Sequence, residues 1–116
     1  MANVLSTSRY KNVKSDLTTA TETVIYTCPA LMTTFVSSIL VSEDTGNADT
    51  ITVTITNGGS VFSIFKVKAV GANGTVELLS NDLILVSGDI LTVTAATANR
   101  LHVVASLVEV PKTTTA

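Results

Sequence analysis

The chain has 116 residues, close to the commonest size of a single domain and long enough for one hydrophobic core. Hydrophobic residues make up 46% of it and charged residues only 14%, against about 25% in average proteins, so threonine, serine and asparagine, or another protein, must cover much of its surface. The formal net charge of −2 excludes a general electrostatic attraction to nucleic acid or to anionic membranes, and the single cysteine excludes an internal disulfide.

Residues 1–20 are predicted to form an extended N-terminal arm, because they are polar and show no periodicity. The arm contains Arg9, Lys11 and Lys14, three of the seven basic residues. A polar arm seldom orders alone, so we expect its own sheet or, by preference, a neighbouring subunit to hold it. The first residues lack the apolar core of a signal peptide, and no apolar run approaches the ~20 residues of a membrane span. We therefore expect the chain to be made in a host cytoplasm.

Short strands separated by turn signals are predicted from residue 23 to residue 110. The clearest is 50–56, where three apolar residues alternate with threonines, and Asn57-Gly58-Gly59 after it predicts a tight hairpin. In the strand that follows, the apolar phase slips near Phe65, which indicates a β-bulge. The predicted strands are 23–28, 34–42, 50–56, 61–70, 75–79, 83–86, 90–95 and 101–110.

Alternation along these strands assigns the core residues. The first strand is expected to bury Val24, Tyr26 and Cys28, and Pro29 ends it because proline cannot donate to a ladder. The expected inward residues of the later strands are Phe35, Ile39 and Val41, then Leu91, Val93 and Ala95, then Leu101, Val103, Ala105 and Leu107.

Eight strands and no helix predict an all-β fold, an antiparallel β-sandwich of about eight strands that is jelly-roll-like and carries the extended N-terminal arm. The expected division is an arm at 1–20, a sandwich at 21–110 and a polar tail at 111–116. An immunoglobulin-like sandwich is the second possibility, although one cysteine and no tryptophan exclude the antibody pattern.

No catalytic, cofactor or metal site is predicted. A nucleophilic cysteine needs a base, usually histidine, and the only candidates are Cys28 and His102. The phase of Cys28 predicts a core residue instead. The acidic loop with Glu43, Asp44 and Asp49 could bind calcium, but it lacks the dense alternation of a dedicated calcium loop, so a solvated turn is expected.

The predicted functional feature is a protein interface. Apolar residues on both faces of 101–110 indicate a doubly covered strand or a surface that faces a partner. The basic, aromatic cluster in the arm is expected to contact an acidic protein surface rather than nucleic acid. The predicted interface residues are Arg9, Tyr10, Lys11 and Lys14 from the arm, and His102, Val104 and Val108 from the last strand.

Three stretches carry a recognisable pattern, namely TVIYTCPALMTTFVSSILVSEDTG (23–46), TITVTI (50–55) and SNDLILVSGDILTVTAATANRLHVVASLVEV (80–110). In this pattern a strand ends in a proline corner, and a later Gly-Asp hairpin enters the final strand. The chain thereby resembles small β-sandwich virion proteins of tailed bacteriophages, especially those of cyanobacterial and marine phages. The resemblance implies a structural role and no enzymatic activity.

The leading hypothesis is therefore a non-enzymatic capsid decoration (cement) protein on the capsid surface of a virion. It would stabilise the shell through homo-oligomeric contacts, with a trimer expected, and through arm-mediated contacts with the major capsid protein or other virion proteins. No nucleic acid, membrane or small-molecule substrate is expected as a partner. The alternatives are a neck, collar, tail or fibre component, and a carbohydrate-binding β-sandwich, which the scarcity of aromatic residues disfavours.

Overall fold

The computed structural model describes residues 8–112, and this part of the chain forms nine strands and no helix. The strands are β1 (Arg9–Asp16), β2 (Thr23–Thr27), β3 (Met32–Glu43), β4 (Asp49–Asn57), β5 (Ser60–Val70), β6 (Thr75–Glu77), β7 (Leu83–Val86), β8 (Ile90–Ala95) and β9 (Leu101–Pro111). All eight predicted strands are present, and β1 is the additional one.

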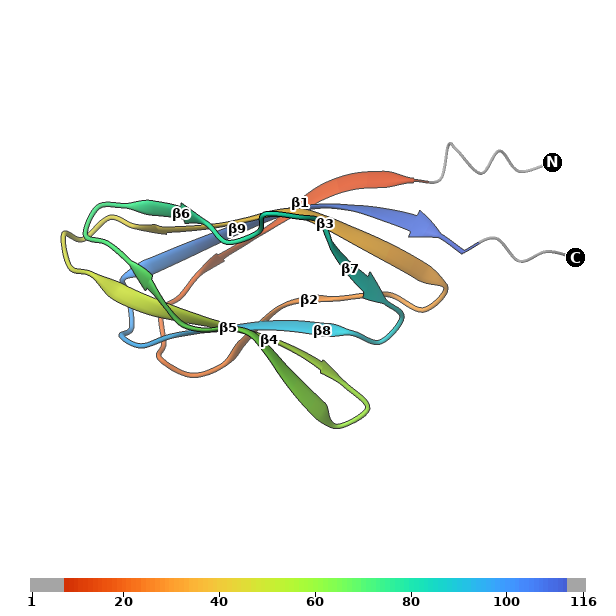
Figure 1. Cartoon of the computed structure of the whole chain (residues 1–116), viewed down its shortest axis with the longest axis horizontal. Helices are drawn as coiled ribbons and strands as arrows, with labels where there is room; N and C mark the ends of the chain where they lie inside the picture. Colours follow the sequence, from red (N-terminus) through yellow and green to blue (C-terminus); the bar gives the residue numbers. More distant parts are fainter. Residues whose placement is uncertain (1–7, 113–116) are drawn as a thin grey trace, which may run out of the picture.

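The strands form two antiparallel sheets that pack face to face (Figure 1). Sheet A has the order β1-β9-β3-β6, and β7 pairs with β3 beside β6. Sheet B has the order β2-β8-β4-β5. The chain passes between the sheets after most strands, and the predicted β4–β5 hairpin and the β6–β7 connection stay within one sheet. The two packed antiparallel sheets confirm the predicted β-sandwich.

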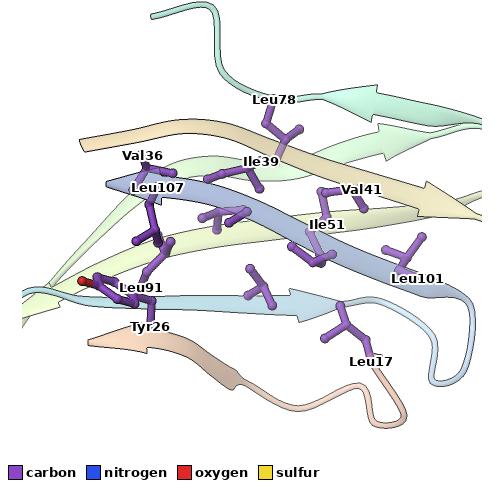
Figure 2. Packing of buried hydrophobic residues seen from close by; sticks show 14 of the residues in the cluster. Leu17, Tyr26, Val36, Ile39, Val41, Ile51, Leu78, Leu91, Leu101 and Leu107 are labelled. Carbon is purple, nitrogen blue, oxygen red and sulfur yellow. The ribbon is translucent and has the colours of Figure 1, made fainter. Parts of the chain in front are cut away.

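The core lies between the sheets, where alternate residues of facing strands interdigitate (Figure 2). The strand alternation is confirmed for β9, whose four predicted inward residues are at most 3% exposed, and for β8. Leu17 closes the sandwich beyond β1, and its N–H donates to the carbonyl of Leu101. Fully buried side chains include Leu17, Ile39, Val41, Ile51, Val53, Leu85, Leu91, Val93 and Leu101.

Bulges change two of the predicted faces. In β3 the register against β9 shifts between Val36 and Ser38, so Ser37 is an extra residue. Val36 is therefore buried and Phe35 lies on the outer face, which corrects the prediction that Phe35 faces inward with Ile39. A bulge reverses the alternation beyond it because the side-chain period of a strand is two.

The same effect explains Val24. The register of β2 against β8 shifts between Val24 and Tyr26, so Tyr26 and Cys28 are buried as predicted while Val24 is 60% exposed. The predicted irregularity near Phe65 is confirmed, since the β4–β5 register shifts on both sides of the Val53–Phe65 pair. Close by, Val67 has a positive φ of 52°, which is uncommon for a β-branched residue.

The predicted N-terminal arm is part of the sandwich from residue 9 onward. Residues 9–16 form β1 and pair in unbroken register with β9, from Arg9 opposite Glu109 to Asp16 opposite His102. The chain's own sheet therefore holds residues 9–16, which lie before the predicted start of the sandwich at residue 21. Residues 1–7 and most of the predicted tail lie outside the described residues.

The core predicts a steep cost for truncation at the centre of sheet B. Leu91→Ala should lower the free energy of unfolding by about 2–5 kcal/mol, because Leu91 is fully buried between the sheets and the cavity would not collapse completely. Val86→Ala is the control, since Val86 is 47% exposed and its loss should change stability by less than about 0.5 kcal/mol. Urea unfolding monitored by circular dichroism measures both, and equal losses would contradict the core assignment.

Candidate interaction surface

An apolar row crosses the outer face of sheet A. Strand pairing places Tyr10 beside Val108, Val108 beside Phe35, and Phe35 beside Ile84, so the row runs through β1, β9, β3 and β7. Tyr10 is 88% exposed and Ile84 is 55% exposed, while the two central residues are half-buried by their neighbours. We call these four residues the apolar row.

Further apolar residues extend the row along the outer face. Val86 lies beside Ile84 on β7, and Leu40 pairs with Val104 nearer the other end of the sheet. Val86 and Leu40 are 47% and 40% exposed, respectively. Contiguous apolar side chains of this kind are unusual on a monomeric protein and mark interaction sites.

A groove lies alongside the apolar row. It has a volume of about 510 Å³, and its lining consists of Tyr10, Lys11, Asn12, Phe35, Ser37, Asp82, Ser106, Leu107 and Val108. The extra residue in β3 lies in this groove, where the Ser37 hydroxyl donates to the carbonyl of Ser106 over 3.3 Å. The bulge thus exposes Phe35 and also shapes the hollow beside it.

Five of the seven predicted interface residues come together on the outer face of sheet A. Tyr10 and Lys14 lie on it from β1, opposite Val108 and Val104 of β9, and His102 lies farther along. Arg9 and Lys11 alternate to the opposite side of β1, so the predicted basic cluster is divided between two faces. The sequence missed Phe35, Leu40, Ile84 and Val86, although alternation within 83–86 could have identified Ile84 and Val86.

Lys11 belongs to a polar network at the edge of the sandwich, where its own side chain is 45% exposed. Its ammonium group lies 3.7 Å from a carboxylate oxygen of Glu109 and 6.0 Å from the centre of the Tyr26 ring. The Tyr26 hydroxyl donates to Glu109 over 2.5 Å and lies 2.8 Å from the Thr34 hydroxyl. Burial and the bond to Glu109 raise the pKa of Tyr26, which therefore stays a neutral donor and joins sheet B to sheet A.

Cys28 is a core residue, as predicted. It is 1% exposed, and its sulfur lies 3.4 Å from the Thr34 hydroxyl and 3.6 Å from the Leu85 carbonyl. His102 is level with Ser42, toward the opposite end of β3 from Thr34. The two residues that a cysteine nucleophile would need are therefore held apart.

His102 lies between two carboxylates at the far end of the outer face. Its Nε2 is 3.3 Å from Asp16, and its Nδ1 is 3.9 Å from Asp44. These contacts become ion pairs when the imidazole is protonated. Within residues 8–112, no group of three or more histidine, cysteine or acidic side chains is arranged to hold a metal ion.

The loop after β3 is organised by a buried carboxylate. Glu43 is 2% exposed and accepts hydrogen bonds from the backbone N–H groups of Thr45, Gly46, Asn47 and Asn73, and from the Thr45 hydroxyl. Burial alone would raise its pKa, but these donors outweigh that effect and hold the pKa at about 2. Asp49 is also buried and accepts from the N–H of Thr97 over 3.1 Å. The expected solvated turn is wrong for Glu43 and Asp49.

Comparisons with known proteins agree with the fold. No family model matches the sequence, and no curated protein matches it significantly. Similar solved structures include a Bacillus endospore appendage protein from a family of disulfide-linked pili, with a TM-score of 0.55 and 16% identity over 92% of this chain and 90% of that one. They also include a pentameric capsid protein isolated from metagenomic phage sequences, with a TM-score of 0.43 and 22% identity.

The capsid protein is the larger molecule, since this chain matches over 94% of its own length but only 64% of the capsid chain. The first similarity shows that the β-sandwich fold is shared. The second is more distant, and neither identity is high enough to establish a common function.

The described residues also contain no helix that is long and apolar enough to cross a membrane.

The Glu43 loop predicts a specific loss of stability in acid. The pKa of Glu43 is lower in the folded chain (about 2) than the ordinary 4.5, so its ionisation stabilises the fold fully above pH 4.5. This contribution is lost as the pH falls from 4.5 toward 2. Glu43→Gln should lower the melting temperature by several degrees at pH 7, and the difference from wild type should narrow below pH 4.5. Differential scanning calorimetry from pH 7 to pH 2 measures this, and a constant difference would refute the assignment.

Proposed function

We propose that this chain is a non-enzymatic structural protein of a phage virion, and that within the virion it is a decoration protein on the capsid surface. The apolar row on the outer face of sheet A is the observation that supports this role. A surface protein gains nothing from four aligned apolar residues in solvent, whereas a protein docked on the major capsid protein would bury them. The sequence resemblance to small virion proteins points in the same direction.

The polar residues also favour a structural role. Within residues 8–112, every buried side-chain nitrogen or oxygen has a hydrogen-bond partner. Glu43 orders a loop and Glu109 links the two sheets, so the hydrogen bonds of these buried carboxylates stabilise the fold. Cys28 is shielded and remote from His102. These observations support a non-enzymatic protein.

Docking would be driven by burial of the apolar row. Apolar area removed from water contributes about 25 cal/mol per Å², and aromatic residues near the centre of an interface commonly carry most of the energy. The molecule measures 54 × 29 × 23 Å, so one face can supply the ~800 Å² per partner of a standard interface. In this mechanism the decoration protein holds neighbouring capsid subunits together by contacting both.

Ile84→Lys tests the docking surface. Ile84 is 55% exposed, so the variant should fold normally, but a lysine in the apolar row would have to be desolvated on docking. We expect copies per purified particle, counted by quantitative mass spectrometry against the major capsid protein, to fall at least tenfold. Thr94→Lys is the control, because Thr94 lies on the outer face of sheet B.

The wild-type copy number tests the decoration role itself. Hundreds of copies per particle are expected on a capsid shell, and about a dozen or fewer would assign the chain to the neck, collar, tail or fibres. Absence from particles, or equal incorporation of Ile84→Lys and wild type, would contradict the proposal in its present form.

The groove beside Tyr10 favours a carbohydrate-binding role as the second candidate. It combines two aromatic rings, Tyr10 and Phe35, with the polar groups of Asn12, Asp82 and Ser106. An exposed aromatic ring beside hydrogen-bonding side chains is the arrangement that sugars need. If this function holds, a glycan array should detect binding by wild type and at least a tenfold loss for Tyr10→Ala. If the chain binds no glycan on the array, the carbohydrate-binding candidate is refuted and docking on the capsid is the one candidate left.

A further inference from the structure

The sandwich has two lateral sides at which both sheets end in free strand edges. On the first side, β1 is the edge of sheet A and β2 is the edge of sheet B, and the two strands touch. On the second side, β5 is the edge of sheet B, and β6 and β7 form the edge of sheet A. A shallow groove lined by Phe65 of β5 and Leu83 of β7 joins these edges. Free edges are templates for pairing with another chain.

The charges on the two sides are complementary in both sheets. In sheet A, the β1 edge carries Lys11 and Lys14, and the opposite edge carries Glu77 at the end of β6 and Asp82 just before β7. In sheet B the signs are reversed. A contact between the two sides would therefore bring unlike charges together in each layer.

The reversed signs in sheet B come from three exposed residues. Glu22 immediately precedes β2, whereas β5 carries Lys66 and Lys68. No side-chain hydrogen bond or ion pair occupies Glu22, Lys66 or Lys68 in the described part of the chain. Their charges are thus available to a neighbour.

The strand register places the complementary charges at the same height in sheet A. One row runs from Lys14 through Val104 and Leu40 to Glu77. An inward row three residues away along β1 runs from Lys11 through Leu107 and Val36 to Leu83, the residue after Asp82. A second copy moved sideways across the sheet, without sliding along the strands, brings its Glu77 to Lys14 of the first copy.

The same displacement matches the charges in sheet B. Thr23 is level with Phe65 through Val93 and Val53. Glu22 precedes Thr23 and Lys66 follows Phe65, and β2 and β5 run in opposite directions, so both charged residues lie on the same side of this row. One sideways displacement therefore brings unlike charges together in both sheets. Two unrelated surfaces would match in both sheets only by coincidence.

Strand directions and exposed side chains agree with this contact. Every pairing from β1 to β6 and from β2 to β5 is antiparallel, so in each sheet the two edges run in opposite directions and would continue an antiparallel sheet. The same edges carry exposed apolar residues that the apolar row does not include. These are Val24 on β2 (60% exposed), and Val61 (59%), Phe62 (57%) and Val67 (60%) on β5.

We propose that copies of this chain associate head to tail, with β1 and β2 of one copy against β6, β7 and β5 of the next. The inference rests on the proposed function, because it names a second partner of the virion protein, another copy of itself. The backbone N–H and C=O groups of the edge strands then pair between copies. The neighbouring copy also covers the uncharged segment 60–65 of β5, which as a free edge would favour aggregation. Such a contact joins two different surfaces, so it closes into a ring or continues as a chain. A purely sideways displacement continues as a chain, whereas the predicted trimer would need each copy to be rotated relative to the next as well.

Glu77 is prepared for such a contact. Its carboxylate accepts hydrogen bonds from the Ser38 hydroxyl and from the N–H of Ile39 over 2.8 Å, which fix its position at the sheet edge. Burial would raise its pKa, but these donors lower it, so the group is ionised and oriented before a second copy arrives. A preorganised charge costs little further ordering on binding.

The test uses Glu22 and Lys66, because these exposed residues can be changed without breaking an internal bond. We expect the full-length wild-type chain to self-associate in sedimentation-velocity experiments at about 50 mM salt, and the association to weaken as salt screens the charges. Glu22→Lys and Lys66→Glu should each raise the dissociation constant about tenfold, equivalent to about 1.4 kcal/mol. The double variant should restore it to within about threefold of wild type. Lys112→Glu, an exposed charge reversal away from both sides, is the control.

Two outcomes would overturn the inference. One is a wild-type chain that stays monomeric up to about 1 mM at low salt. The other is that Glu22→Lys and Lys66→Glu leave the dissociation constant as unchanged as Lys112→Glu does, or that the double variant dissociates as readily as the single variants. The copy number in particles tests the proposed virion function, and the sedimentation experiment tests self-association. A chain that self-associates but is absent from virions would refute the virion function and leave the self-association in place.

Discussion

The pairing of β9 with β3 on one side and β1 on the other is the constraint on which the remaining structure depends. Because β9 is central in sheet A, its register decides which residues of three strands face the core and which face outward. A slip of one residue would turn Leu107 outward and Val108 inward. The register is secured by the buried row from Leu101 to Leu107 and, at its end, by Glu109, whose bond to Tyr26 also fixes the distance between the sheets.

Two kinds of surface follow from this register. The outer face of sheet A is apolar at its centre, whereas the lateral edges combine apolar residues with separated charges. The two proposals assign these surfaces to different contacts, the flat face to a partner beneath the sheet and the edges to a neighbouring copy beside it. If both hold, docking would fix each subunit on the shell and the edge contacts would link it to the next subunit.

Much of this fold follows from simple alternation, and the failures have identifiable causes. The faces of β4 and β8 were predictable because threonine and aliphatic residues alternate along them, and those of β9 because its inward positions are all apolar. β1 was missed because it is an edge strand whose only inward aliphatic residue is Val13, so its polar sequence resembles a flexible arm. Phe35 and Val24 were misplaced because the apolar residues on both sides of these two bulges still fit one alternating face, so no slip of the pattern reveals them, unlike the bulge near Phe65. Glu43 could not have been assigned, since one of its donors, Asn73, comes from a distant turn.

Ser37 shows how a strand can carry an extra residue without changing its two faces. As the extra residue of a bulge, it separates two parts of β3 whose inward and outward phases are set independently. Deleting this one codon would restore a regular strand in which Val36 still faced Leu107 and Ser38 still faced Ser106, so Phe35 would keep its place on the outer face. Related chains could therefore gain or lose this residue through a single in-frame insertion or deletion, with the core and the centre of the outer face both retained.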